Sequence, residues 1–303
     1  MTQQSWTVTG PRTIGVAHVE SLAATVIGGR IDVVAHDDPD RTDVLVEVHS
    51  VVGRPLEIGV DGTTLRIGHG SPESGWKGFV ERFRGYAGKD SADVHVAVPA
   101  RTRVKVATVQ GEGLVAGVRS GLRVGTVTGS VVTSRTAGEL RVDTVSGEVS
   151  AGEHDGDVRM DSVSGSLTAT GDLRSLHVDS VSGTVTVDSR TTPAGVSVTA
   201  VSADVVVRLP DPDAMTYAIR CLSGRLLVDG TEERAAAGSF TRTAPDPGAP
   251  TLRVSAVSGD VAVLRGRPAQ RPDGAPGPAT AGAPTWGSPG TPPTSTVTGP
   301  EDR

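Results

Sequence analysis

The feature that most constrains this chain is a repeat of 18 residues in its centre. Five short segments, TVQG, TVTG, TVSG, SVSG and SVSG, place a valine at the same point of each repeat. These valines are Val109, Val127, Val145, Val163 and Val181. Weaker copies follow at Val201, Leu222 and Val257. A fixed short period of this kind is typical of proteins built from stacked, nearly identical units.

Each repeat has the pattern of a strand, a turn and a second strand. Leu140 to Asp143 alternate apolar and polar residues, as in a half-buried strand, and a Ser-Gly pair then supplies a turn, with Gly147, Gly165 and Gly183 able to adopt positive φ. Because a strand–helix–strand unit needs about 30 residues, the pattern predicts one coil of an all-β, single-stranded parallel β-solenoid. We expect right-handed coils, with the repeated valines stacked in one core.

The rest of the chain divides around this repeat. Residues 1–103 hold irregular alternating strands and a hairpin signal at Asp61-Gly62, so we expect them to open and cap the solenoid. Residues 104–267 form the repetitive solenoid. Residues 268–303 contain nine prolines and few apolar residues, which predicts a disordered tail.

Composition excludes several classes of function. The formal net charge of −6 gives no basic footprint for nucleic acid, and a single cysteine excludes a disulfide framework or a multi-cysteine metal site. The N-terminus lacks the layout of a signal peptide, and no apolar run is long enough to span a membrane. We therefore expect a cytoplasmic protein without a cofactor, a bound metal or a transmembrane segment.

The sequence resembles a known family in its repeat texture. The segment VHVAVP at Val94–Pro99, then VKVATVQG at Val104–Gly111, is followed by repeated V-S-G units. This arrangement is similar to the bacterial putative-adhesin family, also called toast-rack, a family of unknown function. The resemblance covers roughly residues 12–265. It implies a single-stranded β-helix, and some relatives sit beside envelope-stress or membrane-associated systems.

Repeated positions should align as columns on the surface of a solenoid. One predicted column is basic: Lys105, Arg123, Arg141, Arg159 and His177. A second column, two residues on, is acidic: Asp143, Asp161 and Asp179. We interpret the two as a solvated ion-pair face, with a metal ladder as the less favoured alternative.

A third column carries hydroxyl groups. Its members are Thr108, Thr126, Thr144, Ser162 and Ser180. No histidine recurs beside it, so a hydrogen-bonded ladder at a coil corner is favoured over a row of nucleophiles. Cys221 takes the equivalent place in its coil and is expected to be a packed thiol.

The candidate partner-binding site is an aromatic and basic segment. Half of the eight aromatic residues lie within residues 76–86, interleaved with cations, and its candidate contact residues are Trp76, Phe79, Arg82, Phe83, Arg84 and Tyr86. Such a segment suits a protein or membrane-surface partner, or it caps the first coils. The leading functional hypothesis is a non-enzymatic adhesin-like scaffold or interaction protein; the alternative is a carbohydrate-active β-helix lyase or hydrolase.

Overall fold

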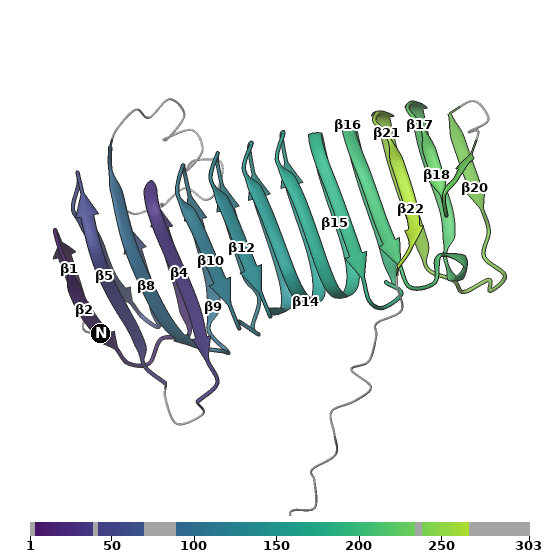
Figure 1. Cartoon of the computed structure of the whole chain (residues 1–303). Helices are drawn as coiled ribbons and strands as arrows, with labels where there is room; N and C mark the ends of the chain where they lie inside the picture. Colours follow the sequence, from purple (N-terminus) through teal and green to yellow (C-terminus); the bar gives the residue numbers. More distant parts are fainter. Residues whose placement is uncertain (1–3, 39–41, 70–88, 234–237, 267–303) are drawn as a thin grey trace, which may run out of the picture. The chain divides into compact units, whose positions relative to one another are not determined.

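The computed structural model is all-β over the residues that the structure describes, which are 4–38, 42–69, 89–233 and 238–266. They form 22 strands and one 3₁₀ turn, and the strands join in one mixed sheet (Figure 1). The bounds are β1 (Gln4–Val8), β2 (Arg12–Val16), β3 (Ser21–Val26), β4 (Gly28–His36), β5 (Val44–Val52), β6 (Leu56–Asp61), β7 (Thr64–Gly68), β8 (Ser91–Pro99), β9 (Arg103–Thr108), β10 (Glu112–Ala116), β11 (Leu122–Thr126), β12 (Ser130–Ser134), β13 (Ala137–Thr144), β14 (Glu148–Ser162), β15 (Ser166–Ser189), β16 (Gly195–Leu209), η1 (Pro212–Ala214), β17 (Thr216–Ser223), β18 (Leu226–Val228), β19 (Thr231–Glu233), β20 (Ser239–Arg242), β21 (Thr251–Ser258) and β22 (Val261–Arg265). The predicted all-β class is confirmed.

The central strands pair in parallel with their copies one repeat away. In one row, β9, β11 and β13 lie side by side, with Lys105 opposite Arg123 and Arg123 opposite Arg141. In a second row, β10, β12 and β14 pair in the same way, with Glu112 opposite Ser130 and Ser130 opposite Glu148. Each partner is therefore one 18-residue repeat away, as the sequence predicts.

Val109 is buried as expected, but the repeated valines from Val127 onward do not fill the core, contrary to expectation. The core consists of the alternating residues of the two strands of each coil, such as Leu140, Val142 and Val149, all fully buried. The valine lies one residue beyond the inward-facing hydroxyl residue, at the corner between the two strands, and points outward. Val163 and Val181 are each 50% exposed. The alternation of inward and outward side chains along the strand therefore ends at the hydroxyl residue and does not continue to the valine.

The glycine of each corner is required mainly by the close approach of neighbouring coils. Gly183 has φ +127°, as expected, but Gly147 and Gly165 are not among the residues with positive φ. A Cβ on Gly147 would lie 2.4 Å from the carbonyl oxygen of Gly129, and one on Gly165 would lie 2.6 Å from that of Gly147. A side chain here would collide with the preceding coil.

At the N-terminal end, spatial order departs from chain order. The strands β3 and β4 pair in parallel with β9 and β10 on one side and with β7 and β8 on the other. Beyond them, β5 and β6 run antiparallel to β8 and β7, and β2 and β1 are added antiparallel to β5 and β6. The hairpin predicted at Asp61-Gly62 joins β6 to β7, with Gly62 at φ +60°. These antiparallel pairs make the sheet mixed rather than purely parallel.

The C-terminal end is rearranged in a similar way. The strands β21 and β22 lie between β16 and the earlier strands β17 and β18, with parallel pairs on both sides. The strands β20 and β19 then pair antiparallel with β17 and β18. The sequence alone predicts coils in chain order, and this expectation is wrong for the last two coils.

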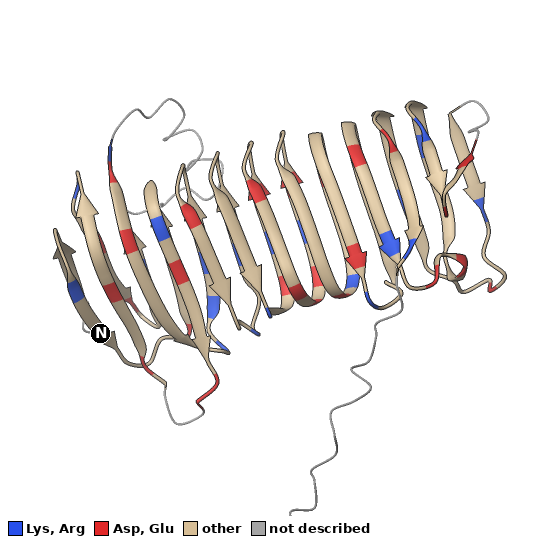
Figure 2. Ribbon diagram, viewed as in Figure 1, with Lys and Arg blue, Asp and Glu red and all other residues tan. Residues whose placement is uncertain are grey.

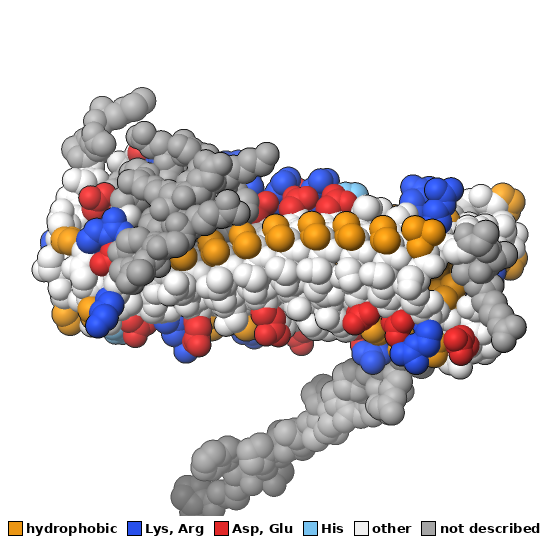
Figure 3. Space-filling model, turned by 90° about the horizontal axis from the view of Figure 1, so that it is seen from above, with side chains coloured by type: hydrophobic (Ala, Val, Ile, Leu, Met, Phe, Trp, Pro, Cys, Tyr) orange, Lys and Arg blue, Asp and Glu red, His pale blue; other side chains and the backbone are white. Residues whose placement is uncertain are grey.

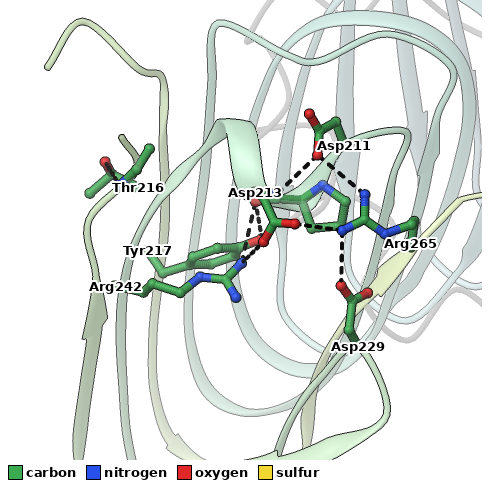
Figure 4. A network of polar contacts seen from close by, with 9 residues as sticks. Asp211, Asp213, Thr216, Tyr217, Asp229, Arg242 and Arg265 are labelled. Carbon is green, nitrogen blue, oxygen red and sulfur yellow. Dashed lines mark hydrogen bonds and ion pairs between the residues drawn. The ribbon is translucent and has the colours of Figure 1, made fainter. Parts of the chain in front are cut away.

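A polar network holds this rearranged end together (Figure 4). The Arg265 guanidinium, at the end of β22, lies 2.7 Å from a carboxylate oxygen of Asp213, 3.2 Å from Asp211 and 3.3 Å from Asp229. The buried Tyr217 donates a hydrogen bond of 2.6 Å to the carbonyl of Pro212. Arg265 thereby ties the inserted coil to η1 and to the residue that follows β18.

Two predicted segments lie outside the described residues. One is the aromatic segment at residues 76–86, and the other is the tail at 268–303. Within the described ranges, no helix is long and apolar enough to cross a membrane.

Candidate functional site

The most distinctive surface of the described residues is a row of exposed aliphatic side chains. We call it the valine ladder, and in spatial order it consists of Val127, Val145, Val163, Val181, Val201, Val257 and Leu222. Val127 and Val145 are half-buried, Val163, Val181, Val201 and Val257 are 50–52% exposed, and Leu222 is 76% exposed. Figure 3 shows the exposed members as a continuous row along the coils.

Stacking of identical corners produces this ladder. The backbone N–H of Val163 donates to the carbonyl of Thr144, and the carbonyl of Val163 accepts from the N–H of Ser182 in the next coil at 2.8 Å. The Ser182 hydroxyl also donates to that carbonyl at 3.4 Å. In the same way, the N–H and the hydroxyl of Ser146 donate to the carbonyl of Val127, and those of Ser164 donate to the carbonyl of Val145. The backbone polar groups of these rungs are thus satisfied within the stack, and the corner presents mainly its side chains.

An ion-pair ladder borders the valine ladder on one side. Its members are Arg123, Arg141, Arg159 and His177, with Asp143, Asp161 and Asp179. Arg123 lies 2.8 Å from Asp143, Arg141 lies 2.9 Å from Asp161, and His177 lies 2.9 Å from Asp179. Figure 3 shows the acidic row next to the hydrophobic row and the basic row beyond it. The predicted ion-pair face is confirmed, although exposed pairs of this kind each contribute only about 0–1 kcal/mol to stability.

The ion-pair ladder links each arginine to the aspartate 20 residues on, which belongs to the next coil. Arg159 continues the pattern with Asp179 at 3.8 Å. Lys105 would require an acidic residue at position 125, which is Gly125. Burial, followed by the nearby charge of Arg123, lowers the pKa of Lys105. The basic column therefore begins two coils before the first aspartate of the acidic column, Asp143. Figure 2 shows where basic and acidic residues lie along the strands.

The hydroxyl column lies at the corner and is hydrogen-bonded, as predicted, but it faces the interior of the corner rather than the surface. Thr108 and Thr126 are fully buried, and the hydroxyl of Thr108 donates to that of Thr126 at 3.1 Å. Ser162 accepts a hydrogen bond of 2.9 Å from the backbone N–H of Gly165. The buried thiol of Cys221 takes the equivalent place, 3.3 Å from the carbonyls of Ser223 and Gly259. Each of these groups is occupied in shaping the turn.

The predicted contact residues cannot be compared with this surface. Trp76, Phe79, Arg82, Phe83, Arg84 and Tyr86 all lie outside the described residues. The valine ladder itself was visible in the sequence as the repeated valine, but it was assigned to the core. Its signal was the reversal of alternation at the corner, where Thr144 points inward and Val145 does not.

Comparison with known families gives one match. The family model described as Toastrack DUF4097 matches residues 31–264. No curated protein matches the sequence.

Eight chains of solved structures match this chain. A protein described as a putative lipid binding protein from Parabacteroides distasonis is 13% identical, with 85% of this chain and 95% of that chain covered and a TM-score of 0.42. A putative adhesin from Bacteroides fragilis is 12% identical, with 87% and 96% covered and a TM-score of 0.34. A putative cell adhesion protein from Clostridium sporogenes is 9% identical, with 84% and 99% covered and a TM-score of 0.27. Likeness at this level carries no argument about function.

Proposed function

The chain belongs to the Toastrack DUF4097 family, and we propose that it is a non-enzymatic, adhesin-like interaction protein whose contact surface is the valine ladder. The observation that carries this proposal is the exposure of a continuous aliphatic row, since four consecutive rungs are 50–52% exposed. Contiguous exposed apolar surface on a soluble protein commonly marks an interaction site, whereas isolated exposed residues do not. The neighbouring ion-pair ladder supplies a polar rim.

The fixed backbone of the ladder supports a binding role. Neighbouring corners are joined by hydrogen bonds from Ser146 to Val127 and from Ser164 to Val145, at 2.8 and 2.7 Å. A partner would meet side chains already held in place, so little ordering entropy would be lost on binding. We also propose that the coils form a right-handed solenoid, as expected for parallel strands joined by crossovers.

The alternative of a carbohydrate-active enzyme is less well supported. Such an enzyme needs a pair of carboxylates facing each other across a bound sugar. The acidic residues of the ion-pair ladder face arginines or a histidine instead, and Asp172 and Asp157 lie 2.7 and 3.4 Å from Arg190 and Arg174. These pairings favour a structural role for those carboxylates.

We also propose where the protein is located and which class of partner it meets. The sequence favours a cytoplasmic protein that meets a protein or membrane-surface partner, and the family resemblance suggests a link to envelope processes. No nucleic-acid role is proposed, because the net charge is −6.

A site-specific photo-crosslinker in the native cell tests the proposed surface. A photoreactive amino acid at position 181, in the middle of the ladder, should form adducts on illumination. The matched control is position 132, because Val132 is 45% exposed but lies outside the ladder. Equal adduct formation at both positions, or none at 181, would contradict the proposal.

A further inference from the structure

We propose that the occupant of the valine ladder is a second copy of this chain, with the two ladders packed face to face. This inference rests on the proposed function, because it uses the same surface. It adds the identity of the partner and the symmetry of the contact.

The spacing of the rungs is the first argument. Neighbouring coils lie about 4.8 Å apart, so the ladder repeats at that distance. An α-helix has a pitch of about 5.4 Å, and its side chains would drift by about 0.6 Å per rung and be half a rung out of register after four. A strand laid along the ladder presents same-face side chains about 6.7 Å apart and loses register at once. A second copy has the same spacing and meets every rung.

The backbone of the ladder is the second argument. Addition of a strand to a sheet requires unpaired N–H and C=O groups. At Val163 the N–H donates to Thr144, and the carbonyl accepts from Ser182. A partner must therefore bind through side chains, and branched aliphatic side chains can interdigitate with another row of the same kind, as in dry interfaces between stacked strands.

The charges beside the ladder select one orientation. The acidic column borders the three rungs Val145, Val163 and Val181 on one side. Serine and threonine side chains, such as Ser146 and Ser164, border the ladder on the other side. A two-fold axis parallel to the ladder places the acidic column of each copy against the serine side of the other. An axis perpendicular to the ladder, in the plane of the contact, would place both acidic columns at the same edge and set Asp179 against Asp179 of the partner when the ladders overlap fully, which is unfavourable. The parallel axis also sets each rung opposite the same rung of the partner.

The size of the ladder predicts a weak, reversible dimer. Seven side chains, most of them half exposed, offer a few hundred Å² per copy, less than the roughly 800 Å² per partner of a standard interface. Association should therefore depend on concentration in the micromolar range or above. A lysine at a central rung would face the same lysine of the partner copy within an apolar contact, so it should weaken dimerisation by at least tenfold.

Sedimentation velocity of the full chain over a concentration series tests this inference. The wild-type protein should shift from monomer to dimer, and Val181→Lys should raise the dissociation constant at least tenfold. The matched control Val132→Lys should dimerise as the wild type does, and thermal melts should show both variants folded. A wild type that remains monomeric at every concentration, or a folded Val181→Lys protein that dimerises normally, would overturn the inference.

Cysteine cross-linking tests the orientation separately. In a Cys221→Ala background, which places an alanine opposite Ala256 of the adjacent coil, Val163→Cys should give a disulfide-linked dimer under mild oxidation, and Val132→Cys should not. With the perpendicular axis Val163 would face Val201 of the partner, and the two cysteines would lie two rungs, about 9.6 Å, apart, too far for a disulfide. Two outcomes would overturn self-association and leave the proposed contact surface standing. In the first, the purified wild type stays monomeric while position 181 forms adducts in cells with a different macromolecule. In the second, the wild type binds anionic vesicles and Val181→Lys does not. If position 181 also forms no adduct, both proposals fail.

Discussion

Replacement of Gly165 by alanine should destabilise the stack at one defined corner. A Cβ at this position would lie 2.5 Å from Cγ2 of Thr144 and 2.6 Å from the carbonyl oxygen of Gly147. Both atoms belong to the preceding coil. They have little room to move, because Ser164 and Ser166 donate backbone hydrogen bonds to the same coil at 2.7 and 3.2 Å.

The expected magnitude follows from two opposing effects. Overpacking of a tight site typically costs about 1–3 kcal/mol. Replacement of glycine by alanine also restricts the unfolded chain, which stabilises the folded state by about 0.4–1 kcal/mol. The net change for Gly165→Ala should therefore be a loss of about 1–2 kcal/mol in the free energy of unfolding.

Gly152→Ala provides a matched control in the same stack. Its new Cβ would meet only the carbonyl oxygen of Thr133, at an ordinary 3.7 Å, and Gly152 is not among the residues with positive φ. This variant should be neutral or more stable by up to about 1 kcal/mol. Urea unfolding followed by far-ultraviolet circular dichroism measures both. If Gly165→Ala is as stable as Gly152→Ala, the corner glycine is not required by the approach of the coils.

Three further predictions follow from burial and composition. Val142→Asp should unfold the protein or cost several kcal/mol, because Val142 is fully buried, whereas Val163→Asp should change the melting temperature little; similar melts for both would contradict the assignment of inside and outside. Burial lowers the pKa of His154, despite the nearby Asp155 and Asp157. The unfolded state therefore binds more protons below about pH 6.5, and the free energy of unfolding should fall as the pH drops through that value. His154→Leu should flatten this pH dependence in urea titrations at pH 5 to 8, and an unchanged dependence would refute the reasoning. In the predicted contact segment, Trp76, Phe79 and Phe83 can be replaced together by serine. If the segment is a contact site, this variant should stay folded and lose binding to anionic vesicles in co-sedimentation. If the segment is a cap, the variant should instead have a lower melting temperature.

Sequence reasoning succeeded where one residue position determines its neighbours in the adjacent coil. The 18-residue period fixed the pairs of Arg123 with Arg141 and of Ser130 with Glu148. Parallel stacking then brought each arginine within reach of an aspartate in the next coil, and the ion-pair ladder follows from these two facts. The repeat also assigned Cys221 to the corner position, and in the structure it lies there opposite Ala256.

It failed where the chain changes direction. The alternation of a strand says which side chains point inward only while the backbone stays extended. At the corner, Thr144 turns inward to hydrogen-bond with the turn, and Val145 is left outside. The candidate surface was missed because a row of valines is usually a core row, although Val145 stands one residue out of phase with the alternation of Leu140 and Val142.

The repeat did not predict the order of the coils at the two ends of the stack. This order is explained by the unpaired edges that a sheet would otherwise leave there. A stack of parallel strands in chain order would end at each side on a strand with unpaired backbone groups. Here the chain runs to the end of the stack before returning, so that β3–β4 and β21–β22 enter as inner coils with partners on both sides. The outermost positions then fall to short antiparallel strands such as β1 and β19, which cannot continue the parallel register of the stack. These ends disfavour the addition of further coils in the parallel register, which is consistent with the proposal that the contact surface is the lateral valine ladder.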